Sequence, residues 1–306
     1  MKTNAAAAVW GGLVADSLAL GAHWIYDTGQ IDSQIGKVDR LMDPPPNSFH
    51  PTKKKGEFTH YGDQTMVLLQ SLAESGEFRL EAFADAWRAH FAGYNGYFDH
   101  ATKETLNHFD AGKPAREAGS RSTDLSGAAR IAPLICCHAD DLSALVTAAR
   151  SQAAMTHNAP DVVDAAEFFA RTLVAVMAGR TPLEALNAVR REHFDRPPFT
   201  AWLDAGLSSA GESTRSAIRR FGQMCDVAAG FPGVVHLIAS YEDRFEDALV
   251  ANVMAGGDSA ARGLLAGTVL GAAAGMDGIP GRWREALVDR HRIQDLLDRL
   301  AEGAET

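Results

Sequence analysis

Apolar residues recur at the spacing of an α-helix along most of the chain. The clearest case lies between Asp161 and Gly179, where apolar positions fall three or four residues apart. Pro160 precedes this segment and Gly179 closes it, as is usual for the two ends of a helix. The same pattern predicts further helices over residues 4–23, 64–75, 80–91, 142–155, 182–193, 245–254, 259–275 and 283–300.

Other stretches are less regular. Residues 24–61 form a long connection with three prolines at 44–46, and so long a connection in a compact domain is usually functional or mobile. Pro133 predicts a short or kinked helix over 126–137. Residues 195–230 are polar and weakly patterned, with a predicted surface loop at 208–216, and residues 233–240 fit a strand or a helix equally well.

Composition strengthens the helical prediction. The 306 residues include 53 Ala and 28 Gly, and aromatic residues make up only 8% of the chain. Alanine is the best helix former, whereas strands favour β-branched and aromatic residues. The sequence shows neither an internal repeat nor a linker. We therefore predict an all-α protein with a single domain over residues 1–306.

The net charge and the cysteines limit the binding partners and the cellular compartment that we expect. The net charge of −10 excludes a surface built for duplex nucleic acid, which needs clustered basic residues. Three cysteines without a C-x-x-C spacing fit a reducing cytoplasm. Lys2 and the apolar run after it resemble a signal peptide, but Asp16 interrupts that run, which favours a mature N-terminal helix. The apolar run at 263–276 is shorter than the roughly 20 residues that span a bilayer, so no membrane partner is predicted.

Two polar segments stand out against this background. Asp16 lies inside an apolar, glycine-flanked helix, where a carboxylate must be paired or must face a polar centre. Glu57, His60 and Asp63 precede the helix at 64–75, and a loop beside a helix N-terminus can bind a hydroxyl or phosphate group. The simpler alternatives are a cap or a salt bridge to a neighbouring helix for Asp16, an N-cap role for Asp63, and capping or packing for His60.

Two glycine-containing segments are candidates for ligand contact. Gly127 lies in a Ser-Gly turn that opens a helix, and Arg130 follows three residues later, so amides and a guanidinium can converge on an anion. Gly256 and Gly257 place Asp258 at the start of a helix that carries glycines at 263, 267, 271 and 275. Four glycines on one face predict that a second backbone packs very close to this helix, at the centre of a bundle.

Together these segments resemble the ADP-ribosylglycohydrolase family, which includes dinitrogenase-reductase-activating glycohydrolases and crystallin J1. The resemblance rests on residues 12–21, 62–69, 127–134, 154–160 and 256–283, which follow the family's order. It implies an all-α orthogonal helical bundle with a central cleft. It also implies hydrolysis of an N- or O-glycosidic bond in an ADP-ribose-type or related nucleoside ligand, either a small molecule or an ADP-ribosylated protein.

The resemblance also implies a metal centre that this sequence only partly retains. Typical members bind two Mg²⁺ ions through an early Thr-Asp-Asp-Thr motif and a late Gly-Gly-Asp-x-Asp-Thr motif. Here Asp63 and Asp258 remain, while positions 62, 64, 260 and 261 hold Gly, Gln, Ala and Ala. Asp63 and Asp258 are therefore the candidate metal ligands that are left, and we expect the Mg²⁺ site to be degraded or absent.

Arg262 adds to this expectation, because it follows Asp258 by four residues on the same helical face. It is either an ordinary i,i+4 partner of Asp258 or a guanidinium that replaces a lost metal. His157, just before a helix, has a similar pair of interpretations, as a ligand contact or as a cap. The candidate ligand-binding residues are Asp16, Gly127, Arg130, His157, Gly256, Gly257 and Arg262.

Within the family's chemistry, Asp63 and Asp258 are the candidates for stabilising an oxocarbenium-like state and activating water. Glu57 or His60 would carry the proton, and Arg130 with the turn at 127 would hold phosphate. The losses in the metal motifs equally motivate a non-catalytic alternative, a ligand-binding or crystallin J1-like structural protein. A Rossmann-type enzyme is disfavoured, because no G-x-G-x-x-G lies in a βαβ pattern.

Overall fold

The computed structural model describes residues 2–303, which form helices and no β-strand, as the sequence predicts. The α-helices are α1 (Lys2–Leu20), α2 (Thr28–Gln30), α3 (His60–Ser75), α4 (Leu80–Ala92), α5 (His100–Asp110), α6 (Ser126–Ala129), α7 (Ile135–His138), α8 (Leu142–Ala154), α9 (Pro160–Met177), α10 (Pro182–His193), α11 (Phe199–Ser208), α12 (Thr214–Phe221), α13 (Val227–Ser240), α14 (Phe245–Met254), α15 (Ser259–Gly278), α16 (Gly281–Ala286) and α17 (Arg290–Gly303). Short 3₁₀ turns at Ala115–Glu117 and Ala132–Leu134 and a π-helical turn at Ile31–Ile35 complete the described elements. None of the described helices is long and apolar enough to cross a membrane.

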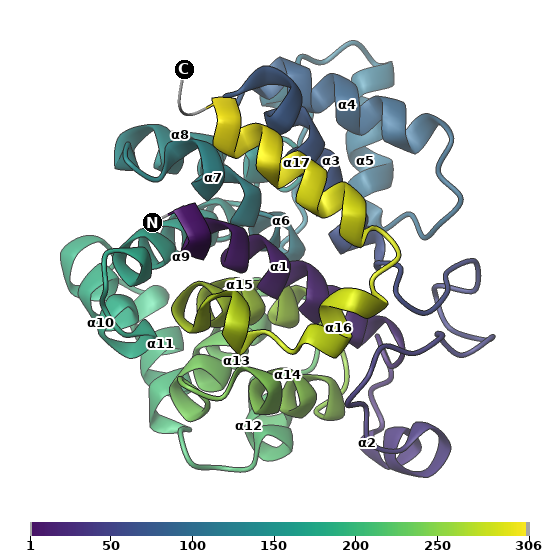
Figure 1. The fold of residues 1–306 in the computed structure, drawn as a ribbon, viewed down its shortest axis with the longest axis vertical. Coiled ribbons are helices and arrows are strands. Elements are labelled where there is room, and N and C mark those ends of the chain that lie inside the picture. Colours follow the sequence, from purple (N-terminus) through teal and green to yellow (C-terminus); the bar gives the residue numbers. More distant parts are fainter. Residues whose placement is uncertain (1, 304–306) are drawn as a thin grey trace.

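Helices α1 and α15 form the centre of the bundle, and the other helices pack around this pair (Figure 1). Their backbones touch, because a methyl group on Gly267 would overlap the carbonyl oxygen of Gly11. A methyl group on Gly271 would lie 2.6 Å from the carbonyl oxygen of Ala7. The predicted close approach is thus confirmed for this part of the glycine ladder. Gly275 departs from the prediction, since its φ of 68° marks a kink that ends the straight part of α15.

Several predicted boundaries are wrong for local reasons. Helix α3 begins at His60, four residues early, because the Thr59 hydroxyl accepts the amide of Tyr61 and caps the helix. Asp63 is therefore not an N-cap. The predicted loop at 208–216 is shorter, since it spans only residues 209–213 between α11 and α12, and residues 233–240 belong to α13. Pro133 does break its segment, into α6, a 3₁₀ turn and α7.

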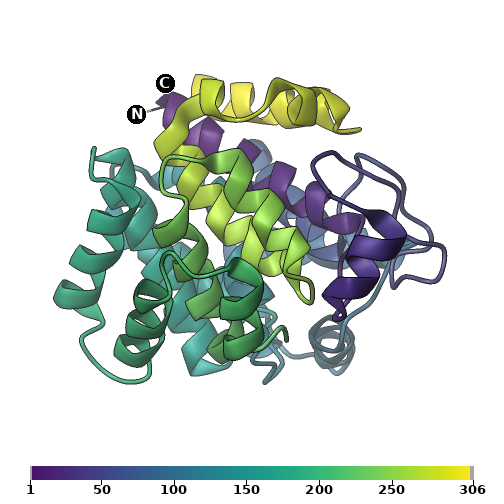
Figure 2. The ribbon, with the colours of Figure 1, turned by 90° about the horizontal axis from the view of Figure 1, so that it is seen from below.

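The connection from Gly21 to Thr59 forms a lobe beside the end of α1, drawn in purple and blue in Figures 1 and 2. Its first part is fastened to the Gly-Gly turn before α15. The amide of Trp24 donates to the carbonyl of Gly257, and the amide of Gly257 donates to Ile25. Near its end, the amide of Val288 donates to the carbonyl of Gly56. The first two bonds set the lobe against the N-terminus of α15, beside Asp258, and the third ties it to the segment after α16.

Candidate active site

Asp16 of α1 is completely buried and is held by the start of α3. Its two carboxylate oxygens accept hydrogen bonds from the Thr59 amide at 2.8 Å and from the Thr59 hydroxyl at 2.6 Å. Burial raises the pKa of Asp16 to about 7, although the bonds from Thr59 pull it down. A methyl group on Gly62 would overlap the Asp16 carboxylate. The glycine at the family's first threonine position therefore makes room for Asp16.

Asp63 is bound by a lysine and a tyrosine. Nζ of Lys53 lies 2.6 Å from Oδ2 of Asp63, and the Tyr94 hydroxyl donates to the same oxygen at 2.5 Å. The Lys53 and Asp63 side chains are only 12% and 14% exposed. Burial, followed by the negative charge of Asp63, raises the pKa of Tyr94 and keeps it protonated. Lys53 is thus turned inward, unlike Lys54 and Lys55, which are exposed as a solvated loop would be.

Asp258 caps α15 and lies among aromatic rings. Its Oδ1 accepts the amide of Ala261 at 3.1 Å, and the Tyr61 hydroxyl lies 3.4 Å from Oδ2. Nδ1 of His23 is 3.9 Å from Oδ1. Burial raises the pKa of Asp258 to about 6, against the lowering effects of the Ala261 amide and the Arg262 charge. Asp258 therefore exchanges its proton near neutral pH.

Gly256 and Gly257, predicted to contact a ligand, serve instead to hold the backbone beside Asp258. Both have positive φ angles, 73° and 66°, which only glycine adopts easily. A Cβ on Gly256 would lie 2.6 Å from the carbonyl oxygen of Ile25. A Cβ on Gly257 would overlap Gln223. Their role in the described structure is to let the lobe approach α15.

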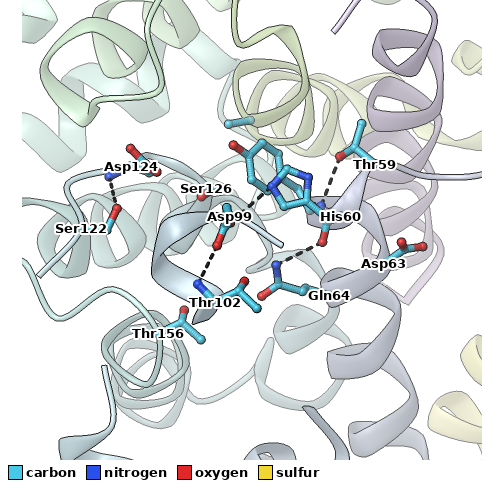
Figure 3. Close-up of polar contacts among 12 residues, drawn as sticks. Thr59, His60, Asp63, Gln64, Asp99, Thr102, Ser122, Asp124, Ser126 and Thr156 are labelled. Atoms are coloured by element: carbon cyan, nitrogen blue, oxygen red, sulfur yellow. Dashed lines mark hydrogen bonds and ion pairs between the residues drawn. The ribbon is translucent and has the colours of Figure 1, made fainter. Parts of the chain in front are cut away.

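His60 pairs with an aspartate that the sequence did not single out. Nε2 of His60 lies 3.3 Å from Oδ2 of Asp99, whose Oδ1 accepts the amide of Thr102 and caps α5 (Figure 3). Burial opposes the charge of Asp99, but its close contact with His60 outweighs burial and holds the pKa of Asp99 below its usual value. Both residues are nearly inaccessible to solvent.

The two carboxylates expected to act together have separate surroundings. In Figure 3, Asp99 points toward His60 on one side of α3, while Asp63 points away on the other side. Asp258 contacts Tyr61, and the Tyr61 ring centre lies 4.0 Å from that of His60. The structure therefore groups Asp258 with His60 and Asp99, and it places Asp63 with Lys53.

Glu57 completes a turn of the loop before α3. Its carboxylate accepts the amide of Lys54 at 2.6 Å, and its carbonyl accepts the hydroxyl of Ser17 at 2.8 Å. No contact joins Glu57 to Asp258 or His60 among the described residues. These contacts make Glu57 a brace between the loop and α1.

Arg130 is 2% exposed and points into the protein instead of toward a phosphate. Its guanidinium donates to Gln152 at 2.7 and 3.0 Å, to Gln64 at 2.9 Å and to the hydroxyl of Thr156. The Arg130 donors already have protein acceptors, which favours a structural role over the predicted phosphate contact. Gln64, at the second aspartate position of the motif, also accepts from Trp87 at 2.8 Å.

Gly127 and His157 pack against each other near this network. A Cβ on Gly127 would lie 2.6 Å from the Cβ of His157. The ring nitrogens of His157 contact the hydroxyls of Thr156 at 2.8 Å and Ser126 at 3.3 Å. Burial lowers the pKa of His157 to about 3, so the ring is neutral and joins α6 to the end of α8. These contacts favour the packing interpretation of His157 over the ligand interpretation.

Arg262 is buried beneath the Gly-Gly turn. Its Nε donates to Oδ1 of Asn252 at 3.1 Å and its Nη2 donates to the carbonyl of Gly256 at 2.6 Å. Nη1 has no partner among the described residues. No ion pair within 4 Å joins it to Asp258 in the described part of the chain, so the simple i,i+4 pair is not formed. Its charge nevertheless acts on Asp258, whose pKa it lowers.

The residues present do not fit a dinuclear Mg²⁺ site. Asp63 is neutralised by Lys53, Gly62 gives its space to Asp16, and the Gln64 oxygen accepts from Arg130 and Trp87. The two alanines at 260 and 261 carry no ligand atoms. Over residues 2–303, no group of three or more His, Cys, Asp and Glu side chains converges as metal ligands would.

Comparison with known proteins shows which family this chain resembles. The family model for ADP-ribosylglycohydrolase matches residues 1–306. Crystallin J1A of Tripedalia cystophora is 27% identical over 303 residues, covering 92% of this chain and 91% of the relative. The ADP-ribosylarginine hydrolase Tri1 of Pseudomonas putida (strain GB-1) is 26% identical over 267 residues, covering 81% of this chain and 67% of Tri1.

A solved structure agrees with these sequence matches. A chain of an ADP-ribosylglycohydrolase-related protein complex superposes with a TM-score of 0.79 at 25% identity, covering 99% of this chain and 98% of that one. The predicted all-α bundle is therefore confirmed at the level of the fold. Because the family model spans residues 1–306, this chain belongs to the ADP-ribosylglycohydrolase family.

Proposed function

We propose that this protein hydrolyses an N- or O-glycosidic bond of an ADP-ribose-type or related nucleoside ligand without a dinuclear metal centre. The observation that carries the proposal is that two buried carboxyl groups, Asp258 and Asp99, both interact electrostatically with His60 and have pKa values shifted in opposite directions. Asp258 has a pKa of about 6, while contact with His60 overcomes burial and keeps Asp99 ionised. Glycoside cleavage by acid and base catalysis needs one group that is protonated and one that is ionised, and a difference between their pKa values provides this.

Each group takes a role from its contacts. Asp258 in its protonated form gives a proton to the leaving atom of the substrate. Ionised Asp99 lies 3.3 Å from Nε2 of His60 and orients the ring by this contact, while neither ring nitrogen makes a hydrogen bond among the described residues. His60 then takes a proton from the attacking water, so Asp99 is a positioning residue. In this scheme His60 activates the water, a role that the sequence analysis gave to Asp63 and Asp258, and Asp258 carries the proton, a role that it gave to Glu57 or His60.

Partly exposed groups interact electrostatically with Asp258, although Asp258 itself is only 1% exposed. Tyr26 is 40% exposed, and Asp124 is partly exposed, yet both lie within electrostatic reach of Asp258. Burial first, and then Cys225, Asp258 and Asp124, raise the pKa of Tyr26 to about 12.

The test is product release by the purified chain from ADP-ribosylarginine, ADP-ribosylserine and an unphosphorylated nucleoside, with EDTA or with added MgCl₂. Asp258→Asn and His60→Asn should each lower turnover by about 10²- to 10⁴-fold. Asp204→Asn, on the surface helix α11, is the matched control and should not change it. Turnover in EDTA supports the proposal, whereas activity that depends on Mg²⁺, or none with any substrate, refutes it.

A non-catalytic protein is the alternative, favoured by the likeness to crystallin J1A and by the lost ligand positions. The same preparations distinguish the two forms of this alternative. Calorimetric binding of ADP-ribose without turnover would indicate a ligand-binding module. Neither binding nor turnover would indicate a structural protein.

A further inference from the structure

A cavity lies in the lobe, and Nδ1 of His23 in its lining is 3.9 Å from Oδ1 of Asp258. The cavity has a volume of about 350 Å³ and is lined by residues of the segments 23–34 and 45–49. We call it the aromatic pocket, because His23, Trp24, Tyr26 and Phe49 line it together with the amides of Gln34 and Asn47. The role given to Asp258 does not use this cavity, and the sequence offered no motif for it.

The polar atoms at the inner end of the aromatic pocket have no partners. Neither ring nitrogen of His23 nor Nε1 of Trp24 makes a hydrogen bond among the described residues. His23 is 3% exposed, so solvent cannot replace these bonds freely. The imidazole ring has a hydrogen-bonding atom at each nitrogen, and leaving both without a partner in a buried place is costly.

The mouth of the aromatic pocket exposes aromatic faces. Phe49 is 52% exposed and Tyr26 is 40% exposed, which is unusual for large apolar side chains in this protein. The Phe49 ring centre lies 5.0 Å from that of Trp24, in an edge-to-face arrangement. Exposed rings beside a cavity are what a planar ligand needs for stacking.

The backbone holds this arrangement under strain. Trp24 has a φ of 63°, and it is the one non-glycine residue with a positive φ in the described chain. The paired hydrogen bonds of Trp24 and Ile25 with Gly257 impose this conformation. Strain of this kind persists where the surrounding structure enforces it, and here it sets the direction of the indole.

The charges near the aromatic pocket disfavour a cationic ligand. The Arg262 guanidinium lies beneath the Gly-Gly turn to which Trp24 is bonded, and its Nη1 has no partner among the described residues, so this side of the pocket already carries a positive charge. Asp27, the carboxylate of the pocket lining, is engaged as the N-cap of α2, where it accepts the amide of Gly29 at 2.8 Å. A neutral ring with its own donor and acceptor matches His23 better than an ammonium or a guanidinium does.

We infer that the aromatic pocket binds a neutral, planar heteroaromatic group, such as a nucleobase, which stacks on Phe49 and Tyr26 and hydrogen-bonds to His23. Nδ1 of His23 is 3.9 Å from Oδ1 of Asp258, so the ring would lie beside the proposed acid. If the proposed function holds, this ring is the leaving group of an N-glycoside.

The corresponding step balances without another reactant. The bond from the anomeric carbon to the ring nitrogen breaks with its electron pair on nitrogen, which takes the proton of Asp258. The oxygen of water bonds to the anomeric carbon, and His60 takes the proton that water releases. Solvent then returns a proton from His60 to Asp258, and the products are the free sugar and the free base.

Binding of free bases tests the aromatic pocket separately from catalysis. Adenine, nicotinamide and, as a cationic probe, benzyltrimethylammonium are titrated into the full chain by calorimetry. Phe49→Ala and Tyr26→Ala should each weaken binding of the neutral bases about tenfold, the size expected for losing one stacking partner. Leu142→Ala, an exposed residue at the start of α8, is the control and should bind as the parent does.

The outcomes separate this inference from the proposed function. Saturable binding of a neutral base that both substitutions weaken supports the pocket even if no substrate is hydrolysed. No binding of either base, binding that neither substitution changes, or tighter binding of benzyltrimethylammonium overturns the inference. Turnover without base binding would leave the proposed function standing and remove the heteroaromatic leaving group.

Discussion

Removing the ammonium of Lys53 should show how much this positive charge stabilises the carboxylate of Asp63 in a site without a metal. We consider the substitution Lys53→Met, which keeps the length of the side chain and removes the charge. The ammonium lies 2.6 Å from an Asp63 oxygen, and both side chains are less than 15% exposed. With charge centres about 3 Å apart and an effective dielectric of about 20, the attraction is about 5 kcal/mol. Desolvation of both ions offsets part of it.

What remains after the substitution sets the net effect. Asp63 would keep the hydrogen bond from Tyr94 at 2.5 Å, so its carboxylate would not be wholly without a partner. Breaking a fully buried pair costs about 3–5 kcal/mol, and the remaining bond and partial exposure reduce this value. We therefore expect Lys53→Met to lower the free energy of unfolding by about 2 kcal/mol.

The assay is urea unfolding of Lys53→Met, Asp63→Asn and the double variant. The double variant should be about as stable as Asp63→Asn alone, because Lys53 has then already lost its partner, which corresponds to a coupling energy of about 2 kcal/mol. Additive effects, or a cost under about 0.5 kcal/mol for Lys53→Met, would refute the reasoning. So would stabilisation of the parent protein by Mg²⁺ with two ions bound per chain, since that would place metals where we place Lys53.

Three further predictions follow from the buried groups. Because the pKa of Asp16 is about 7 when folded and about 4 when unfolded, its contribution to stability is present below pH 4 and is lost as pH rises through 7. Asp16→Asn should flatten this part of the stability profile, which amounts to about 4 kcal/mol at most, and an unchanged profile would contradict it. In pH–rate measurements, kcat/KM should fall above pH 6 as Asp258 loses its proton, and a profile without this limb would exclude Asp258 as the acid. Gly267→Ala should cost about 3 kcal/mol by thermal or urea unfolding because its methyl group meets the Gly11 carbonyl, whereas Gly93→Ala, with open space around it, should cost under 1.

The helices with strong apolar periodicity could be predicted from the sequence, and others could not. Helix α9 has an apolar stripe and a proline start, both visible in the chain. Helix α5 is polar, with the sequence HATKETLNHFD, and was not predicted. Its start depends on the cap from Asp99, and its buried residues are small, so periodicity gave no signal there. A pattern of apolar residues reports burial in the core and not capping at a junction.

Some residues of the candidate site could likewise be predicted from the sequence, and others could not. Asp16 and Asp258 were identifiable because each is a carboxylate in an apolar or glycine-rich setting. Asp99 and Lys53 could not be identified in this way, because their importance comes from contacts with His60 and Asp63 that form only when the chain is folded. The signal that could have found Asp99 is its place directly before a helix, where Asp is a preferred N-cap, but that signal concerns capping and not chemistry.

The replacements in the metal motifs are connected to one another, and this argues against simple decay of a site. Loss of ligands alone would leave buried carboxylates without compensation, which is strongly unfavourable. Instead, Gly62 admits Asp16, and Lys53 neutralises Asp63. Gln64 supplies an acceptor to Arg130, while Asp258 with a pKa near 6 needs no full counter-charge. Each retained acid is therefore balanced by this chain's own residues. Restoring one family ligand alone, such as threonine at position 62, would displace Asp16 before it could help to bind a metal.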